Sequence, residues 1–171
     1  MTFPLNLPAN EKDLIINQLI KINNFTFDFD QTSNEKKENG KCILIFNNRL
    51  KCNYNDEKQK ELLINNRTLV VIHKRYNKKY FFPVKNSPLI KILNKKKLIQ
   101  VIRESEMSIN DNITLTYQSD VEVVVFFDKK SYEFLGWKIK DNFQNEIFFS
   151  LKIKSINDTY DPKIFKIPSI N

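Results

Sequence analysis

Hydrophobic residues alternate with polar ones along 40–54, and this is the clearest pattern in the chain. Alternate positions of a strand face the same side, so the segment predicts two antiparallel strands with one apolar face. A three-residue loop over 46–48 would place Leu44 opposite Leu50 and Cys42 opposite Cys52. The apolar face consists of Cys42, Leu44, Phe46, Leu50, Cys52 and Tyr54. These side chains are chemically quiet, which indicates a surface that encloses something apolar.

The same period of two continues along most of the chain and predicts a largely antiparallel sheet. Phe25, Phe27 and Phe29 face one way, and polar or acidic residues lie between them. The charged segment 33–39 is expected to be a loop, and Asn65 with Asn66 a tight turn, because asparagine tolerates positive φ. Further strands are predicted at 62–64, 68–72, 80–82, 113–117, 121–127, 132–139 and 146–153. Their spacing is typical of a continuous meander.

Helical spacing replaces this pattern in two regions. Asn10 is a suitable cap for a first helix, with Asp13 as its capping-box partner. Ser87 and Pro88 are typical of the cap and first residue of a second helix. The apolar stripes of these helices are Ile15, Ile16, Leu19 and Ile20, then Leu89, Ile90, Ile92 and Leu93, with Leu98, Ile99, Val101 and Ile102 in a third piece. The predicted class is α+β, mostly β.

The length and composition fit one domain over residues 10–171. The chain has 171 residues, of which 41% are hydrophobic, and no apolar run approaches the ~20 residues that a membrane-spanning helix needs. Residues 1–9 are apolar, contain two prolines and end in Ala9 before a polar stretch. They resemble the last part of a secretory signal peptide, and the alternative is an ordinary frayed terminus. The first interpretation predicts export of the protein.

A formal charge of +8 raises the question of nucleic-acid binding. The excess is lysine rather than arginine, and it is spread over most strands and turns, with short clusters at 74–75, 78–79 and 95–97. A solvated surface with some affinity for anionic membranes or partners is therefore the favoured interpretation. The phenylalanines could stack bases, but those at 25–29 alternate with acidic residues and are better explained by a core or an apolar cavity.

Few residues in the chain favour catalysis or metal binding. His73 is the single histidine, and it lies in a predicted strand, where a surface role is the simpler interpretation. One histidine and two cysteines without CxxC spacing make a poor metal site. Gly40 and Gly136 are the two glycines, too far apart to form a phosphate-binding loop. We expect no enzyme activity, no metal and no cofactor.

Cys42 and Cys52 leave two interpretations open. If the predicted register holds, they lie opposite each other, close enough for a cross-strand disulfide. Such a bridge would require an oxidising compartment and would contribute roughly 2–3 kcal/mol. The alternative is two buried thiols that act as small hydrophobic side chains.

Several short motifs, in consistent order from the first helix to Pro168, resemble the periplasmic outer-membrane lipoprotein carriers of the LolA family. Phe25-x-x-x-Phe29-x-Gln31 resembles the opening F-x-x-x-F-x-Q strand of that family, and Gly40 to Tyr54 its G-x-L-x-V-x-R-P-x-x-F-x-W hairpin. The other matching segments are Asn65 to Leu69 (family D-G-K-T-L), Ser87 to Leu93 (T-P-x-x-L-L), Asp141 to Ile147 (D-x-x-G-x-x-T-x-I) and Phe165 to Pro168 (F-x-F-x-x-P).

The resemblance implies an unclosed, strongly curved antiparallel barrel whose mouth is covered by helices. Between sheet and helices it implies an apolar cavity that shields the acyl chains of lipoproteins, which an inner-membrane ABC transporter loads and an outer-membrane receptor accepts. The implied cavity residues are Phe25, Phe29, Leu44, Phe46 and Leu50, and the implied lid residues are Leu89, Ile90, Ile92 and Leu93. A monomer is expected.

The chain departs from the family pattern in the hairpin. Phe46 and Asn47 stand where the family has Arg-Pro, whose arginine helps to hold the lid closed, and Cys52 stands in place of the family tryptophan. Apolar contact through Phe46 is our hypothesis for how the lid is held instead. The predicted function is a lipid-shielding carrier. The main alternative is a basic β-barrel that binds single-stranded nucleic acid, with free cysteines and salt-sensitive affinity.

Overall fold

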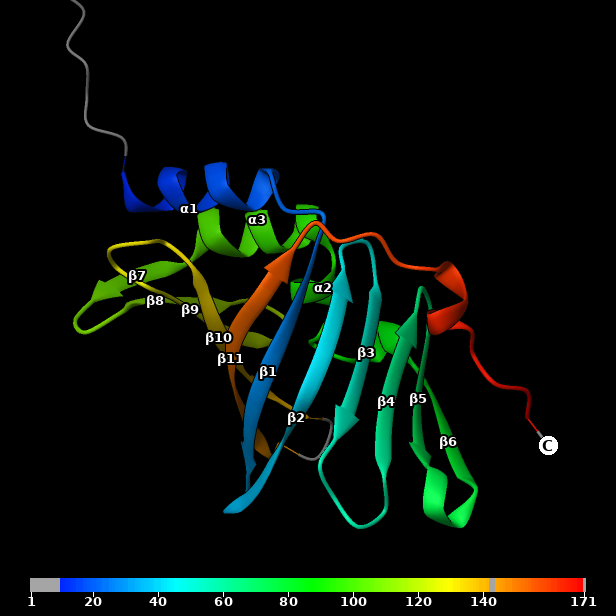
Figure 1. Ribbon diagram of the computed structural model, residues 1–171. Coiled ribbons are helices and arrows are strands. Elements are labelled where there is room, and N and C mark those ends of the chain that lie inside the picture. Colours follow the sequence, from blue (N-terminus) through cyan, green and yellow to red (C-terminus); the bar gives the residue numbers. More distant parts are fainter. Residues whose placement is uncertain (1–9, 142–143, 171) are drawn as a thin grey trace, which may run out of the picture.

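A single antiparallel sheet of eleven strands forms most of the structure (Figure 1). The computed structural model describes residues 10–141 and 144–170, so the expected leader remnant at 1–9 lies outside the described residues. The first meander consists of β1 (Asn24–Ser33), β2 (Lys36–Ile45), β3 (Arg49–Tyr54), β4 (Lys60–Asn65), β5 (Thr68–His73) and β6 (Lys78–Pro83). The second consists of β7 (Glu106–Ile109), β8 (Ile113–Gln118), β9 (Glu122–Phe127), β10 (Phe134–Lys140) and β11 (Glu146–Ile156).

The first and last strands hold the two meanders together. Strand β1 lies between β2 and β11, with Phe29 opposite Gly40 on one side and Leu151 on the other. Strands β6 and β7 are the two edges, so the described sheet is not closed into a barrel. The predicted unclosed antiparallel sheet with helices is therefore confirmed. The predicted continuous meander is wrong, because the helices carry the chain from edge β6 to the opposite edge β7.

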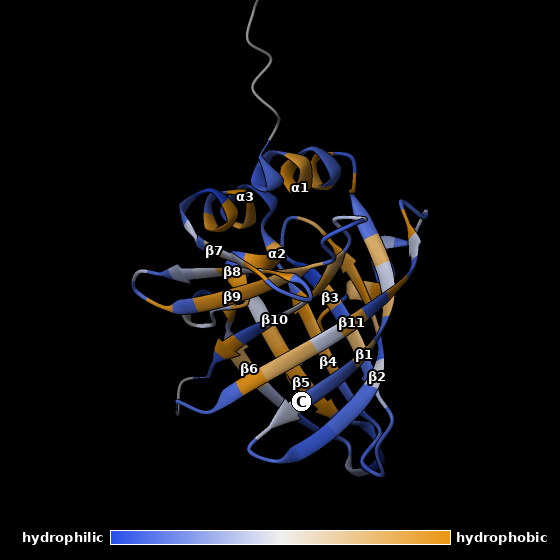
Figure 2. Cartoon of the chain, turned by 90° about the vertical axis from the view of Figure 1, so that its left-hand side faces the viewer, coloured by the Kyte–Doolittle hydropathy of each residue, from blue (hydrophilic) through white to orange (hydrophobic). Residues whose placement is uncertain are grey.

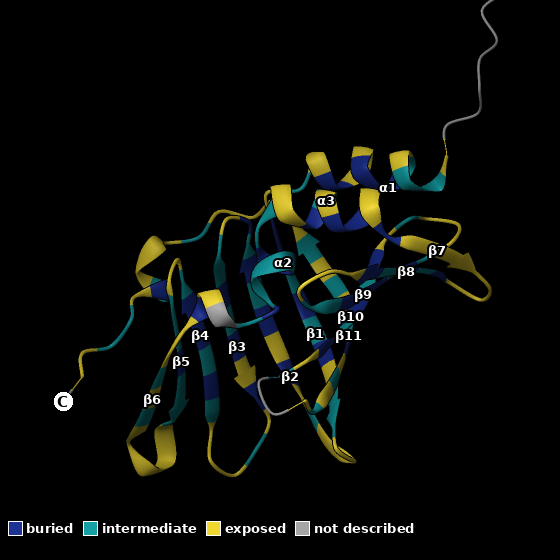
Figure 3. Ribbon diagram, turned by 180° about the vertical axis from the view of Figure 1, so that it is seen from behind, coloured by how far each residue is buried: buried dark blue, intermediate teal, exposed yellow. Residues whose placement is uncertain are grey.

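Three α-helices cover one part of this sheet: α1 (Glu11–Ile20), α2 (Ile90–Leu93) and α3 (Lys95–Glu104). Helices α1 and α3 pack against each other across one end of the sheet, whereas α2 lies in its concavity (Figure 1, Figure 3). Figure 2 shows hydrophobic residues, in orange, both on these helices and on the strands they cover. Short 3-10 helices follow β5, β6 and the last strand: η1 (Lys74–Tyr76), η2 (Val84–Asn86) and η3 (Pro162–Phe165).

The N-terminal helix begins where the sequence predicts. Oδ1 of Asn10 accepts a hydrogen bond from the Asp13 amide at 3.0 Å, which satisfies one of the free donors of the first turn. The buried positions are Ile15, Ile16 and Leu19. Ile20 is 57% exposed, so its predicted place in the buried stripe is wrong. It follows Leu19 by one residue and therefore points ~100° away from it around the helix.

The predicted loop at 33–39 is wrong, because most of it is strand. Strand β1 continues to Ser33 and β2 starts at Lys36, so that only Asn34 and Glu35 connect them. Both connecting residues have positive φ, 48° and 66°, as a two-residue hairpin turn requires. The charges in this segment reflect solvent exposure at the strand ends, not the lack of a strand.

Strand β7 and the β4–β5 turn also differ from the prediction. The prediction contained no strand at β7, because all four residues of β7 are exposed and lack the alternation of a half-buried strand. The β4–β5 turn lies at Asn66 and Arg67, one residue later than predicted, with Asn66 at φ 56°. The tolerance of asparagine for positive φ explains the turn without glycine.

The two glycines of the chain lie where strands approach closely. A Cβ atom on Gly40 would lie 2.0 Å from the carbonyl oxygen of Asn53 on β3, and one on Gly136 would lie 2.1 Å from that of Phe149 on β11. Gly136 also has φ +148°, which strains any other residue. Both glycines therefore allow neighbouring strands to pack without a collision with the backbone.

Candidate functional site

Two rows of apolar side chains run across the concave face of the first meander. Their members are directly opposite one another on successive strands, as the predicted hairpin register requires at Cys42–Cys52 and Leu44–Leu50. The first row is Phe27, Cys42, Cys52, Leu62, Val71 and Tyr80, and the second is Phe25, Leu44, Leu50, Ile64, Leu69 and Phe82. Each row is fully buried on β1 and ends nearly half exposed on β6, at Tyr80 (44%) and Phe82 (49%).

The part of this face on β1 and β2 is filled. Phe25 contacts the rings of Phe46 and Phe134 at centroid distances of 5.9 and 6.3 Å. Phe149 stacks between Phe29 and Trp137, at 4.7 and 4.3 Å. All five predicted cavity residues are buried in this packed core, Phe25, Phe29, Leu44, Phe46 and Leu50, and only Leu50 also lines a pocket.

The part of the face on β3 to β6 borders a largely apolar groove. Its inner pocket, of ≈210 Å³, is lined by Leu50, Cys52, Tyr54, Trp137 and Phe149 together with residues that it shares with an outer pocket. The outer pocket, of ≈380 Å³, extends to Phe82, Pro83, Ser87 and Pro88. The residues common to both pockets are Leu62, Val71, Leu89, Ile139 and Ile147. We call the two adjacent pockets together the groove; its walls come from both meanders and from the segment before α2.

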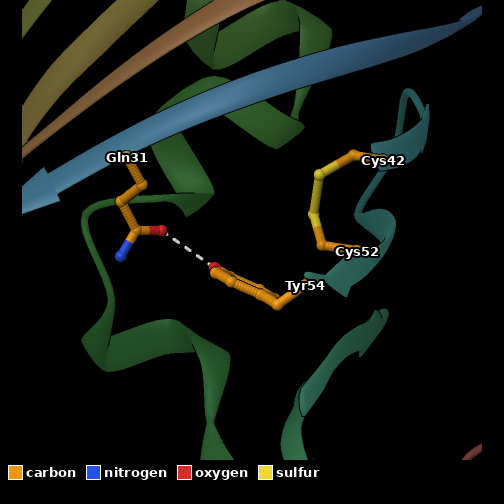
Figure 4. The surroundings of a disulfide bond; sticks show 4 residues. All are labelled: Gln31, Cys42, Cys52 and Tyr54. Atoms are coloured by element: carbon orange, nitrogen blue, oxygen red, sulfur yellow. Dashed lines mark hydrogen bonds between the residues drawn. A yellow bond between two sulfur atoms is a disulfide. The ribbon is translucent and has the colours of Figure 1, made fainter. Parts of the chain in front are cut away.

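A small polar cluster lies at the inner end of the groove. The Tyr54 hydroxyl donates a hydrogen bond of 2.8 Å to Oε1 of Gln31 (Figure 4). The ammonium group of Lys60 lies 4.0 Å from the centre of the Tyr54 ring and pairs with Glu38. Gln31, Tyr54 and Lys60 all line the inner pocket. They are the polar part of an otherwise apolar lining.

The charges of this cluster are set by burial and by its neighbours. Burial, and then the negative charges of Glu38 and Asp56, raise the pKa of Tyr54, so its hydroxyl stays protonated and available as a donor. Burial alone would raise the pKa of Glu38, but hydrogen bonds and charge from Lys60 and Lys36 outweigh it and hold that pKa below its ordinary value. The inner end of the groove therefore holds the protonated hydroxyl of Tyr54 beside the ion pair of Lys60 and Glu38.

Cys42 and Cys52 form a disulfide in the structure, with the sulfur atoms 2.02 Å apart (Figure 4). Cys42 is enclosed by the packed core, whereas Cys52 also lines the inner pocket. The bridge thus lies at the boundary between the filled part of the face and the groove. The residues alone left a bridge and two thiols equally open, and the structure contains the bridge.

The predicted lid residues divide between the groove and the core. Leu89 faces both pockets, Ile90 is half-buried, and Ile92 and Leu93 are fully buried. The backbone amides of Asn47 and Asn48 both donate to the Leu93 carbonyl, at 3.1 and 3.2 Å. The tip of the β2–β3 hairpin therefore holds the end of α2 by backbone hydrogen bonds.

Phe46 also contacts the helical layer from this hairpin tip. Its ring lies 5.1 Å from the ammonium group of Lys95 at the start of α3, in addition to its contact with Phe25. Whether this contact holds a lid stays a prediction.

Sequence reasoning found Leu50 and Leu89 of the groove and missed most of its other walls. The alternation at 62–64 and 68–72, continued from the hairpin register, carried a signal for Leu62 and Val71. No local signal marks the opposite wall, at Trp137, Ile139 and Ile147, because it depends on the pairing of β1 with β11.

The described residues offer little for metal chemistry. Within residues 10–141 and 144–170, no three His, Cys, Asp or Glu side chains gather as metal ligands would. His73 ends β5, and its ring lies 5.5 Å from that of Tyr80.

Within residues 10–141 and 144–170, no helix is long and apolar enough to cross a bilayer.

Comparison with known proteins gives a likeness of fold. No protein-family model matches the sequence. No curated protein matches it at a significant level.

Among solved structures, the chain is similar to a LolA superfamily protein from Nitrosomonas europaea, at 8% identity and a TM-score of 0.45 over 93% of this chain and 99% of that one. It is similar to a domain assigned to outer-membrane lipoprotein sorting from Vibrio parahaemolyticus, at 7% identity and a TM-score of 0.45 over 91% and 97%. It is also similar to MucB in the MucA/MucB complex of Pseudomonas aeruginosa, at 10% identity and a TM-score of 0.49. This alignment covers 94% of this chain and 62% of that one. The structural neighbours thus include LolA superfamily proteins, the family that the sequence resembles, and the likeness concerns the fold.

Proposed function

We propose that this protein is a periplasmic carrier that shields the acyl chains of lipoproteins in its groove and ferries them from the inner to the outer membrane. The observation that supports this is the groove itself, a largely apolar hollow beside a packed core. Its shared walls are Leu62, Val71, Leu89, Ile139 and Ile147. Each methylene group taken out of water into such a hollow contributes about 0.8 kcal/mol, so a single acyl chain would bind without any charged anchor.

The disulfide supports the proposed compartment. Bridges such as Cys42–Cys52 persist in oxidising surroundings, including the bacterial periplasm, and are rare in the cytosol. Loading by an inner-membrane ABC transporter and release to an outer-membrane receptor are part of the proposal, as is a monomeric carrier. The protein would act by binding alone.

The test is a titration of the purified protein with a fluorescent fatty-acyl probe. We expect saturable binding that persists in high salt and is unaffected by single-stranded DNA. Val71 faces both pockets, so Val71→Trp should fill the groove and weaken probe binding at least tenfold. Ile72 is the matched control: it is also half-buried on β5 but packs on the opposite face, and Ile72→Trp should bind the probe as the wild type does.

Two outcomes would contradict the proposal. Equal binding by the wild type and both variants would place the probe outside the groove. No acyl binding, together with salt-sensitive binding of single-stranded DNA, would favour the basic nucleic-acid-binding alternative instead. If the probe binds as expected, transfer of an acylated lipoprotein between membrane vesicles is the next measurement.

A further inference from the structure

The positive charge of the chain is concentrated in one continuous segment, residues 62–103. This segment has eleven Lys and Arg residues and no Asp or Glu, whereas the rest of the chain has 17 Lys and Arg against 20 Asp and Glu. Lys and Arg residues occur along most of the chain, as expected, but outside this segment they are balanced by carboxylates. The cations are Arg67, Lys74, Arg75, Lys78, Lys79, Lys85, Lys91, Lys95, Lys96, Lys97 and Arg103.

The β5–β6 hairpin presents several of these cations to solvent at the free edge of the sheet (Figure 1). Arg75 and Lys78 are exposed, and half-buried Lys79 reaches the Ser169 carbonyl at 3.4 Å. Lys74 pairs with Glu61 at 2.7 Å. Arg75 donates to the backbone carbonyl of Glu57, a neutral acceptor, at 3.3 Å.

Exposed aromatic side chains lie on the same hairpin. Tyr76, in η1, is 54% exposed, and Tyr80 and Phe82, on β6, are 44% and 49% exposed. Tyr80 and Phe82 are the last members of the two apolar rows, and Phe82 lines the outer pocket. The apolar surface of the groove therefore continues onto an edge that also carries cations.

Protection of the sheet edge explains only part of this pattern. Lysines on an edge strand discourage pairing with a second sheet. The other edge, β7 (Glu106–Ile109), has no Lys or Arg, so a cationic edge is not a general feature of this sheet. Edge protection also does not require exposed aromatic rings. Tyrosine and phenylalanine beside Lys and Arg are instead typical of surfaces that lie in the headgroup region of a bilayer.

We propose that the β5–β6 hairpin docks the protein onto an anionic lipid bilayer. Tyr76, Tyr80 and Phe82 lie at the level of the headgroups, and Arg75, Lys78 and Lys79 contact the anionic lipids. Docking is independent of acyl binding. Docking also turns the outer pocket toward the membrane; this part of the proposal rests on the proposed function of the groove.

The first test is co-sedimentation with phosphatidylcholine vesicles that either contain or lack phosphatidylglycerol. The wild-type protein should bind the anionic vesicles, and binding should weaken as salt is added. Replacing both cations in Lys78→Gln/Lys79→Gln should lower the affinity roughly 25-fold, at about fivefold for each cation removed from an anionic surface. Tyr76→Ser should lower the binding that remains in high salt, because that part depends on the ring.

A matched control exists in the β9–β10 turn. Lys129 and Lys130 are also consecutive, both are exposed, and Lys129, like Lys79, contacts a backbone carbonyl, that of Asn110. Lys129→Gln/Lys130→Gln makes the same change in net charge and should bind vesicles as the wild type does. Thermal unfolding of all variants checks that they are folded.

Three outcomes would overturn the proposal: no binding of the wild type to anionic vesicles, equal losses in the two double variants, or binding of single-stranded DNA through Lys78 and Lys79 without vesicle binding. The acyl titration in the absence of vesicles separates this proposal from the groove. Probe binding should depend on Val71 and not on Lys78 or Lys79, so either proposal can fail alone.

Discussion

The two parts of the concave face have the same pattern of residues, but one is packed as core and the other is open to a groove. On β1 and β2 the apolar rows are buried under helices and aromatic rings, and from β3 to β6 most members of the same rows border the groove. Cys42 and Leu62 belong to one row, yet Cys42 is in the core and Leu62 lines the groove. Alternation therefore makes a face apolar, but what lies above that face decides whether it becomes core or binding surface.

The covering elements explain the difference. Helix α2 places Ile92 and Leu93 in the core, while the segment before it leaves Leu89 at the groove. The second meander supplies Trp137 and Phe149, which fill the space over β1 and reach only the inner end of the groove. The predictions below compare the two parts, from the largest expected effect to the smallest.

The strongest comparison is between two leucines on the same face. Leu44 is fully buried in the filled part, so Leu44→Ala should lower the free energy of unfolding by about 2–5 kcal/mol through lost contacts and a new cavity. Leu62 already borders empty space, so Leu62→Ala should cost clearly less and should instead weaken acyl-probe binding. Urea unfolding of both variants measures this. Equal losses of stability would mean that the groove is packed in solution.

The disulfide at the boundary should have the next largest effect. Replacing both cysteines in Cys42→Ala/Cys52→Ala removes a bridge between residues ten positions apart and should lower the free energy of unfolding by about 2–3 kcal/mol. Thermal unfolding of the wild type with and without reductant is the corresponding measurement. The double variant should not respond to reductant, and an unchanged wild type under reducing conditions would show that the bridge does not stabilise the fold.

The polar cluster should contribute less. Tyr54→Phe removes the hydrogen bond to Gln31 and should lower the free energy of unfolding by about 1 kcal/mol. Tyr80→Phe is the control, because Tyr80 is 44% exposed and its hydroxyl should be replaceable at almost no cost. A Tyr54→Phe variant as stable as the control would mean that water substitutes for the phenol at the inner end of the groove.

The smallest effect concerns pH. Lys60 and Lys36 hold the pKa of Glu38 below its ordinary value despite the opposing effect of burial. The unfolded chain therefore takes up the proton first as the pH falls. The stabilisation is complete above the unfolded pKa and is lost as the pH drops through the folded one. The stability difference between wild type and Glu38→Gln should thus be largest at neutral pH and shrink in acid. A difference that does not vary with pH would contradict this.

Local patterns were enough to predict much of the fold. The cap at Asn10, the register of the β2–β3 hairpin and most strands follow from side-chain period and turn chemistry. The predicted cap at Ser87 is wrong, because α2 begins only at Ile90 and its start has no side-chain cap. The prediction was wrong where charge was taken to exclude a strand, at 33–39, and it contained no β7. In both places the backbone forms strand hydrogen bonds with a neighbouring strand, although no alternation of apolar residues predicts a strand there.

What the sequence by itself determined is therefore the apolar face, including the row that holds Cys42, Cys52 and Leu62, and the charge of segment 62–103. Only the tertiary structure decided which part of that face is filled. The pairing of β1 with β11, residues more than a hundred positions apart, brings Ile139 and Ile147 opposite Val71. The physical reason is that alternation specifies the direction of each side chain, whereas a cavity depends on which distant elements reach it and where they stop.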